Sequence, residues 1–229
     1  IEICRKVWRR EPLVHDGNIF TLPLPADEGT GVGKPIKLMH HPIRPDIPIW
    51  WGSLAPRAVE ATAELANGWL TFLLIPEKLR DVWGESLDRG LAKRDDALGP
   101  LRIQAGVKVA IGEHVDATPI HDSLRSMLAL YVGGMGARGK NFYNDLAVAY
   151  GFESEAAEIQ NRYLAGRRAE AADLVPITWL DSMCVVGPPG HVAERLAALR
   201  EAGVTDLSVD PVGADPVTTL EQVRSLIEG

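Results

Sequence analysis

Hydrophobic and polar positions over residues 47–74 follow two different periods. A compact apolar run over residues 47–51 precedes a helical pattern over residues 56–66, and a second apolar run covers residues 69–74. A strand, a helix and a strand within about thirty residues are typical of a βαβ unit with parallel strands. Because both apolar runs are continuous rather than alternating, the pattern predicts strands that are buried on both faces.

The alternation of strand and helix continues to the end of the chain. The periodicity predicts helices over residues 76–94, 119–132, 142–164 and 192–202, strands over residues 103–111 and 204–209, and a short apolar stretch over residues 183–186. Asp215 is a good N-cap for a closing helix because Pro216 follows it at the first helical position. Strands and helices in this order indicate the α/β class.

The chain opens with a helical pattern instead of an initiator Met. The apolar positions of this helix share one face: Ile1, Ile3, Cys4, Val7 and Trp8. Pro12 predicts that the helix ends near Glu11. A hairpin is predicted over residues 14–24 and an ordered surface loop, rich in Gly and Pro, over residues 25–48. We expect an earlier part of the polypeptide to precede residue 1.

Two architectures compete for this pattern, an open doubly wound sheet and a closed barrel. An open sheet that binds a dinucleotide usually carries Gly-x-Gly-x-x-Gly after a strand, and no such motif follows a predicted strand here. About four strands can be counted, half of the eight in a (β/α)8 barrel. Alone they would leave two parallel strand edges unpaired. The sequence therefore predicts a single domain over residues 1–229, the C-terminal portion of a (β/α)8 TIM barrel whose N-terminal strands are absent from this chain.

Composition and charge exclude several classes of function. A net charge of -7 and a pI near 5.4 argue against a general binder of nucleic-acid backbones. No apolar run approaches the ~20 residues that span a bilayer and no signal-peptide pattern opens the chain, so we expect no membrane partner and a cytoplasmic protein. Cys4 and Cys184 are expected to be reduced, buried thiols. The scattered His residues predict no metal site.

Three blocks of residues resemble one family in the same order along the chain. Residues 47–58 (IPIWWGSLAPRA) and 64–70 (ELANGWL) resemble the fifth and sixth strand region of luciferase-like flavin and deazaflavin oxidoreductases. Residues 131–145 (YVGGMGARGKNFYND) resemble a segment frequent in the branch that depends on coenzyme F420. Residues 186–196 (VGPPGHVAERL) and 201–207 (EAGVTDL) are similar to the last helix and strand of that family.

The resemblance implies a cofactor at the C-terminal mouth of the barrel, where the loop after the fifth strand offers backbone N–H groups to a phosphate. Here that loop is Gly52, Ser53, Leu54 and Ala55. Unpaired N–H groups and the dipole at a helix N-terminus favour an anion independently of the resemblance. Many relatives have two glycines where this chain has Leu54 and Ala55, so an ordinary βα turn is the alternative. Thr71, at the end of the next strand, is a further candidate to face the mouth.

The segment over residues 131–143 concentrates polar side chains near a glycine-rich break between two helices. We expect Met135, Arg138 and Lys140 to line the mouth for substrate or cofactor, because glycines there permit unusual backbone angles. The alternative is a plain helix–loop–helix connection with solvated Arg138 and Lys140.

Two other motifs have structural interpretations. Gly187-Pro188-Pro189-Gly190 is interpreted as a rigid helix start, because its two prolines lack the N–H donors of a phosphate site. For Trp50, Trp51 and Trp69 we expect core packing rather than stacking on a cofactor.

The resemblance implies hydride transfer between the deazaflavin C5 of F420 and a small organic substrate. Relatives supply the residues around the ring largely from their first four strands, so no catalytic acid or base is identified here. His40, His41 and His121 are the titratable side chains to test, with surface-loop positions as the alternative. Two other functions remain open: an FMN-dependent luciferase-like monooxygenase, and a non-catalytic half-barrel that assembles with another chain. We expect a homodimer or association with the missing N-terminal part.

Overall fold

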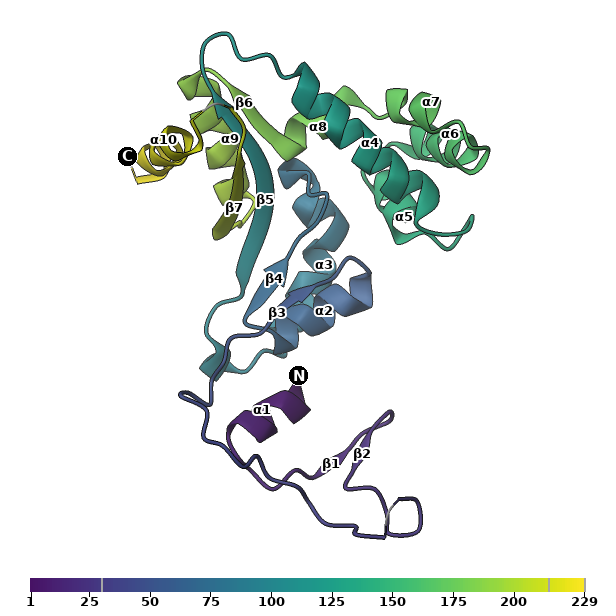
Figure 1. The fold of residues 1–229 in the computed structure, drawn as a ribbon, viewed down its shortest axis with the longest axis vertical. Coiled ribbons are helices and arrows are strands. Elements are labelled where there is room, and N and C mark those ends of the chain that lie inside the picture. Colours follow the sequence, from purple (N-terminus) through teal and green to yellow (C-terminus); the bar gives the residue numbers. More distant parts are fainter. Residues whose placement is uncertain (30, 214, 229) are drawn as a thin grey trace.

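A parallel five-stranded sheet forms the centre of the computed structural model, which describes residues 1–29, 31–213 and 215–228 (Figure 1). The strands are β3 (Trp50–Gly52), β4 (Gly68–Leu70), β5 (Arg102–Ile111), β6 (Cys184–Gly187) and β7 (Asp206–Pro211). The long strand β5 pairs with β4 near its start, with β6 near its end, and with β7 along residues 104–109. The predicted α/β class and the parallel βαβ unit are confirmed.

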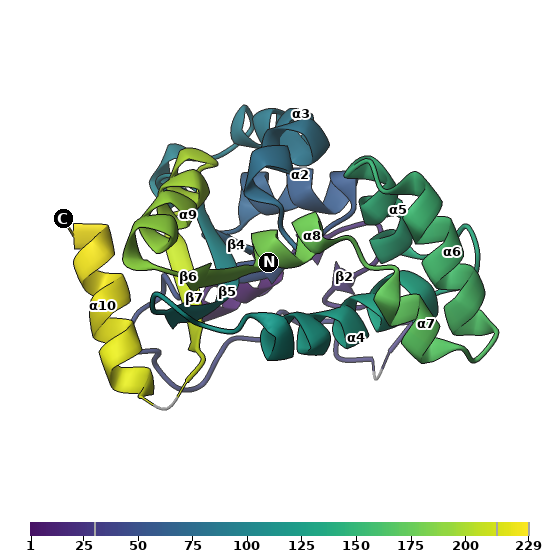
Figure 2. The same cartoon turned by 90° about the horizontal axis from the view of Figure 1, so that it is seen from above.

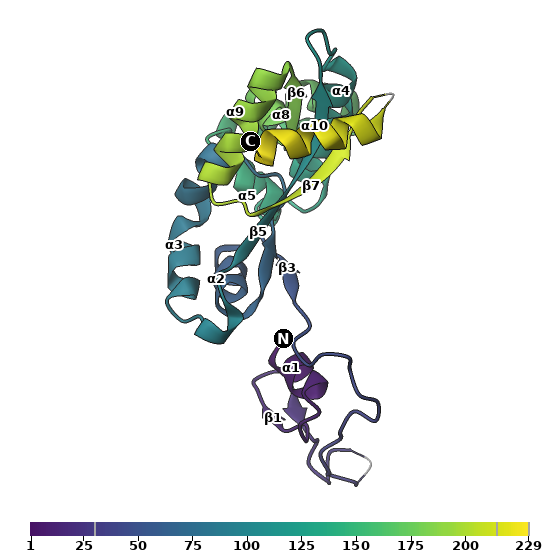
Figure 3. The same cartoon turned by 90° about the vertical axis from the view of Figure 1, so that its left-hand side faces the viewer.

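Helices cover one face of this sheet. They are α2 (Pro56–Leu65), α3 (Leu79–Leu91), which follows the 3-10 turn η1 (Pro76–Lys78), α9 (Pro189–Glu201) and α10 (Pro216–Glu228). Figures 2 and 3 show α2, α3 and α9 on the same side of β5. A second 3-10 turn, η2 (Asp96–Leu98), leads into β5. The side chain of Asp215 accepts a hydrogen bond from the backbone of Thr218, so the predicted cap of the closing helix is confirmed.

Between β5 and β6 the chain builds a bundle of helices to one side of the sheet (Figure 1). These helices are α4 (Thr118–Gly134), α5 (Phe142–Ala149), α6 (Glu153–Leu164), α7 (Arg168–Asp173) and α8 (Ile177–Met183). The last two were not predicted, because helices of six and seven residues are too short to show a period. The bundle separates β5 from β6 in sequence while their backbones pair directly.

The first part of the chain lies beyond the N-terminal ends of the strands (Figure 1). It contains α1 (Glu2–Trp8) and the two-stranded antiparallel hairpin of β1 (His15–Asp16) and β2 (Thr21–Leu22). The predicted first helix and hairpin are therefore confirmed. Cys4 in α1 is exposed, so the expectation of a buried thiol is wrong for Cys4, although it holds for Cys184.

The two faces of the sheet have different character. Toward the helices it presents Trp69, Val107 and Val109, which are fully or nearly fully buried. The opposite face carries charged side chains, and Lys108 there forms an ion pair with Asp210 across the β5–β7 pairing, 2.5 Å apart. The expectation that the apolar runs are buried on both faces is wrong for this second face. Leu70 is 39% exposed on it, because no described helix covers that stretch.

The three tryptophans of the first βαβ unit have three different environments. Trp69 is buried, as predicted. Trp50 lies on the polar face, where its ring covers Gly68 and the guanidinium of Arg102 lies 5.0 Å from the ring centroid. Trp51 is 37% exposed at the edge strand, so the core position predicted for it is wrong.

Helix α2 ends at Leu65, just before Asn67 and Gly68, and long-range contacts stabilise its end. Its C-cap, Ala66, is extended (φ -95°, ψ 159°), and Gly68 already belongs to β4. The packing of β3 against β4 requires glycine at position 68, because a Cβ there would collide with the ring of Trp50. The carbonyls at the helix end accept hydrogen bonds from Arg94, which reaches Ala63 and Ala66 at 2.7 and 2.6 Å. A cation at the C-terminal end of a helix also stabilises the helix by its interaction with the helix dipole.

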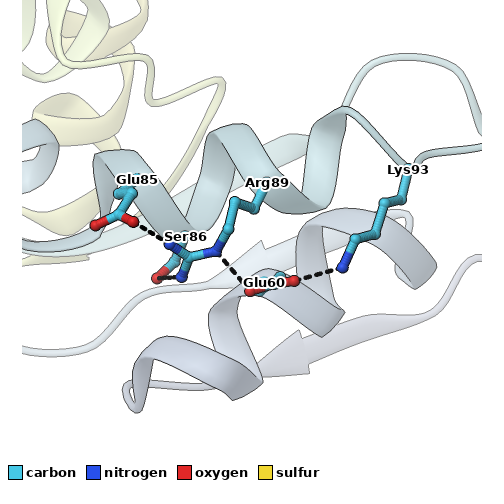
Figure 4. A network of polar contacts seen from close by, with 5 residues as sticks. All are labelled: Glu60, Glu85, Ser86, Arg89 and Lys93. Carbon is cyan, nitrogen blue, oxygen red and sulfur yellow. Dashed lines mark hydrogen bonds and ion pairs between the residues drawn. The ribbon is translucent and has the colours of Figure 1, made fainter.

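Polar side chains connect α2 to α3 along their exposed edge (Figure 4). Glu60 of α2 accepts hydrogen bonds from Arg89 at 2.9 Å and from Lys93 at 2.6 Å. The Lys93 ammonium, followed by the Arg89 guanidinium, holds the pKa of Glu60 below its usual value. Glu85 and Ser86 contact the same guanidinium. Such surface pairs contribute little free energy each, so the close packing of the two helices below them matters more.

Aromatic rings connect this helical layer to the bundle. The centroid distances are 5.3 Å for Trp69–Trp83, 6.1 Å for Trp83–Tyr150 and 5.5 Å for Tyr150–Trp179, each with the edge of one ring toward the face of the other. Edge-to-face pairs of this kind contribute beyond the area that they bury. The chain of rings therefore holds α3, α5 and α8 in a defined relation to β4.

Tyr150 also supports a strained backbone position after β4. Leu73 has φ +56°, a left-handed conformation that is costly for a residue with a side chain. The buried Tyr150 hydroxyl donates to the Leu73 carbonyl at 3.0 Å and accepts from the Ile75 N–H at 3.3 Å. Burial raises the pKa of Tyr150 far above its usual value, so the hydroxyl stays neutral.

Replacing Tyr150 by Phe is expected to lower the free energy of unfolding by about 1–2 kcal/mol, because the buried Ile75 N–H loses its acceptor. Chemical denaturation of the two proteins measures the difference. Tyr163→Phe is the control, because the Tyr163 hydroxyl has no hydrogen bond among the described residues and its ring stays in place. Equal losses for both variants would contradict the role given to the Tyr150 hydroxyl.

Candidate functional site

The loop after β3 leads directly into the first turn of α2. Ala55 is the N-cap residue of α2, with extended φ -65° and ψ 140°, and Pro56 is the first helical residue. Ser53 is nearly buried, whereas Gly52 is exposed. The sequence prediction that residues 52–55 form the approach to a helix N-terminus is therefore confirmed.

Two tryptophans determine which way the peptide groups of this loop point. The indole N–H of Trp69 donates to the Ser53 carbonyl, and that of Trp83 donates to the Leu54 carbonyl, both at 2.9 Å. Both carbonyls are thus turned toward the buried rings. In a trans peptide the N–H points opposite to the C=O, and neither peptide is cis. The N–H groups of Leu54 and Ala55 therefore point away from the core.

These N–H groups have no acceptor among the described residues. They lie beside the first turn of α2, whose own N–H groups and dipole also favour a negative charge. Two fixed donors at a helix N-terminus can bind a phosphate or carboxylate group. The Leu54 and Ala55 side chains do not prevent this, because backbone groups make the contact.

The side chains of Ser53 and Thr71 are already engaged. Ser53 Oγ lies 2.8 Å from Thr62 Oγ1 of α2. Thr71 Oγ1 donates to the Gln104 carbonyl at 2.8 Å, and the Thr71 N–H donates to the same oxygen at 3.0 Å. Thr71 therefore extends the pairing of β4 with β5 and keeps only acceptor capacity for a ligand.

The glycine-rich segment between α4 and α5 is an ordered connection. A Cβ on Gly133 or Gly134 would collide with Tyr163 of α6. Glycine is therefore required at these two positions by the packing of α4 against α6, and the expectation of unusual backbone angles is wrong for them. In this segment only Gly139 has a positive φ, +70°. The spacing Gly-x-Gly-x-x-Gly occurs over residues 134–139, but there it follows a helix and lacks the strand of a dinucleotide-binding motif.

Aromatic contacts place this connection next to the end of β4. Phe72 lies 4.8 Å from Tyr131 and 6.0 Å from Tyr143, measured between ring centroids. Burial raises the pKa of Tyr143, so its hydroxyl is neutral at physiological pH. The two ends of the connection therefore lie at the C-terminal edge of the sheet.

The three predicted residues of the connection are exposed. Met135, the C-cap of α4, is 52% exposed. Arg138 donates to the side chain of Asn161 at 2.8 Å. Lys140 lies in a turn in which its backbone N–H donates to the Ala137 carbonyl at 2.9 Å. Their role in binding stays a prediction.

Asn141 has a structural role in this connection, although the sequence suggested only that its side chain could line the mouth, as those of Arg138 and Lys140 could. It is 2% exposed. Its Nδ2 donates to the carbonyls of Tyr131 and Val132, both at 2.9 Å, and its Oδ1 accepts from the N–H groups of Tyr143 and Asn144. One side chain thus joins the end of α4 to the start of α5. An Asn at the predicted start of a helix is the signal that could have identified it.

The candidate histidines lie in two separate places. His40 and His41 are exposed in the N-terminal part of the chain, where His41 contacts Arg10. His121 lies near the start of α4, in a cavity that none of residues 52–55 lines. The structure therefore does not bring a histidine to the loop before α2.

The Gly187–Gly190 motif and Cys184 have structural roles. Pro188 is the N-cap of α9 and Pro189 its first residue, so the interpretation as a rigid helix start is confirmed. Burial, followed by the nearby charge of Asp181, raises the pKa of the Cys184 thiol to about 11. The thiol is thus protonated at neutral pH and is a poor nucleophile.

Comparisons with known proteins agree on one family. Residues 1–206 match the family model described as luciferase-like monooxygenase. A Mycobacterium tuberculosis protein named as a coenzyme F420-dependent oxidoreductase is 35% identical over 99% of the chain and 63% of its own length. The 5,10-methylenetetrahydromethanopterin reductase of Archaeoglobus fulgidus is 25% identical over 97% of the chain and 62% of its own length. The chain thus spans less than two thirds of these curated relatives.

Solved structures show the same fold. The F420-dependent tetrahydromethanopterin reductase of Methanopyrus kandleri superposes with a TM-score of 0.66 at 20% identity, covering 97% of this chain and 59% of the reductase. An F420-dependent secondary alcohol dehydrogenase, in complex with an F420-acetone adduct, superposes with a TM-score of 0.54 at 14% identity, covering 98% and 58%. The predicted TIM-barrel type of fold is confirmed. Within residues 1–29, 31–213 and 215–228, no helix is both long and apolar enough to cross a bilayer.

Proposed function

Because the chain belongs to the luciferase-like monooxygenase family, we propose that it is part of an F420-dependent oxidoreductase that acts on a small organic substrate. One curated relative and two solved structures are named for this coenzyme, which supports F420 over FMN. When bound, the deazaflavin accepts or donates the hydride at its C5. The protein's own contribution is to hold the coenzyme and to orient it toward the substrate.

One observation carries the proposal: the Leu54 and Ala55 N–H groups point away from the core, next to the N-terminus of α2. An anionic tail of the coenzyme would accept hydrogen bonds from these donors. Trp69 and Trp83 fix the donors before the ligand arrives, so binding costs little ordering of this loop. The α4–α5 connection, with Met135, Arg138 and Lys140, is proposed to contact the substrate or the rest of the coenzyme.

Ala55→Pro tests the donor directly. Its φ of -65° and ψ of 140° suit proline, so the substitution removes one N–H while the backbone keeps its course. A hydrogen bond to a charged group contributes about 1.5–3 kcal/mol, so the Kd for F420 is expected to rise at least about 10-fold in a fluorescence titration. Ala55→Ser keeps the N–H and is the matched control, with affinity close to the parent.

The outcomes of this titration separate the alternatives. Equal affinity of the parent and Ala55→Pro would show that the phosphate binds elsewhere. Tight binding of FMN without binding of F420 would favour a flavin monooxygenase. If the complete protein binds neither compound, the enzyme proposal fails and a non-catalytic assembly partner becomes the better interpretation.

A further inference from the structure

A cavity of about 620 Å³ lies where α4, α8, β6 and α9 meet. The residues of the loop before α2 do not line it, so it is separate from the proposed coenzyme site. Its wall includes the Arg195–Glu77 ion pair, 2.5 Å apart, in which the carboxylate neutralises the guanidinium. The cavity is thus not a strongly cationic pocket of the kind that selects a phosphate.

Three side chains with metal-binding atoms meet at this cavity. They are His121 of α4, Asp181 of α8 and Cys184 at the start of β6, and one ligand atom of each lies within 4.8 Å of the other two. His121 Nε2 is buried and has no hydrogen bond among the described residues, although it lies 3.2 Å from Asp181 Oδ1. A buried polar atom without a hydrogen bond is costly unless something else binds it.

The chemistry of these three atoms defines the class of ligand. Imidazole nitrogen and thiolate sulfur suit borderline-soft transition metals, whereas magnesium and calcium prefer sites built from oxygen alone. We propose that His121, Asp181 and Cys184 bind a divalent metal ion of the zinc type, with the cavity leaving a fourth coordination position open.

Small side-chain movements are enough to form the site. In a tetrahedral zinc site the metal–nitrogen and metal–oxygen distances are about 2.0–2.2 Å and metal–sulfur about 2.3 Å, so neighbouring ligand atoms lie closer together than the 4.8 Å found here. Asp181 has a side chain that is 60% exposed and is free to move inward. The thiol of Cys184 now donates to the Leu180 carbonyl at 3.3 Å, and it would give up its proton to solvent on binding the cation.

The site joins elements that are remote in sequence. His121 belongs to the first helix of the bundle, Asp181 to its last helix, and Cys184 to the sheet. A bound ion would therefore fix the bundle to the sheet. Because the metal binds the folded protein, it is also expected to raise the melting temperature.

The complete protein, stripped of metal with a chelator and carrying Cys4→Ser, tests the proposal by titration with cobalt(II). The substitution removes the exposed thiol of α1 as a competing ligand. Binding of one equivalent of cobalt with a thiolate-to-cobalt charge-transfer band is expected, and zinc should displace the cobalt. Loss of a residue that only hydrogen-bonds to a metal ligand weakens metal binding about 10–100-fold, so loss of a ligand itself, as in Cys184→Ser or His121→Ala, should weaken it by at least about 100-fold.

His191→Ala is the matched control, because His191 lines the same cavity outside the cluster. It should bind cobalt as the parent does. Asp181→Asn alters an exposed side chain and is expected to fold. Its affinity for cobalt is expected to fall, so this variant tests the site even if Cys184→Ser is unstable. The proposal is overturned if the parent takes up no cobalt. It is also overturned if Asp181→Asn and at least one of the two single variants Cys184→Ser and His121→Ala bind cobalt as tightly as the parent.

Discussion

Gly90→Ala is expected to lower the free energy of unfolding by about 2–3 kcal/mol. A Cβ at Gly90 of α3 would collide with the Glu60 carbonyl of α2 and lie 2.7 Å from the Ala63 Cβ. The obstacle is helix backbone, which moves only if the two helices separate. The cost of overpacking a rigid contact therefore exceeds the ~1 kcal/mol that Ala gains over Gly in a helix. Urea denaturation of the two proteins measures the difference.

Gly84→Ala on the same helix is the control, and the opposite sign is expected. The three atoms nearest to a Cβ at Gly84 all belong to the guanidinium of Arg80, at the end of a flexible side chain, and the nearest of them lies 3.2 Å away. The helix should therefore gain about 0.5–1 kcal/mol from the better propensity of Ala. If Gly84→Ala destabilises as much as Gly90→Ala, the contact between α2 and α3 is not the reason for the Gly90 effect.

Asn141→Ala is expected to destabilise the protein by about 3 kcal/mol. The substitution removes the Asn141 Nδ2 donor from the Tyr131 and Val132 carbonyls, of which Val132 keeps only the Asn144 Nδ2 donor at 3.2 Å, and it removes the cap of α5. Loss of a cap costs up to about 2 kcal/mol, and each lost hydrogen bond about 0.5–1.5 kcal/mol. Thermal unfolding should show a lower melting temperature. Hydrogen exchange should show faster opening over residues 131–144.

Lys140→Ala, one residue earlier, separates structure from binding. Its exposed side chain has no partner among the described residues, so stability is expected to stay within about 0.5 kcal/mol of the parent. Affinity for F420 or substrate is expected to change if the connection lines the mouth. A variant with unchanged stability and unchanged affinity would show that the connection is structural only.

Local signals in the sequence predicted the elements well. Asp215 before Pro216, and Pro188 before Pro189, mark helix starts because a cap and its helix lie within a few residues of each other. The period of the apolar residues identified β3, β4, β5 and β7 with shifted ends, whereas residues 183–186, where β6 forms, were predicted only as a short apolar stretch. These features depend only on neighbours in the chain.

Long-range contacts decided what local signals could not. The end of α2 depends on Arg94, which is 28 residues beyond Ala66, and Gly68 is required by the ring of Trp50. The exposure of Trp51 follows from its place on an edge strand, because composition does not show which strand lies at an edge.

The sequence by itself determined the α/β class, the order of the elements and the loop that precedes α2. Only the tertiary structure decided how Trp69 and Trp83 turn the peptides of that loop, and that His121, Asp181 and Cys184 meet. The physical reason is that secondary structure follows from interactions between near neighbours, whereas a site needs side chains from distant elements, whose meeting depends on strand register and helix packing.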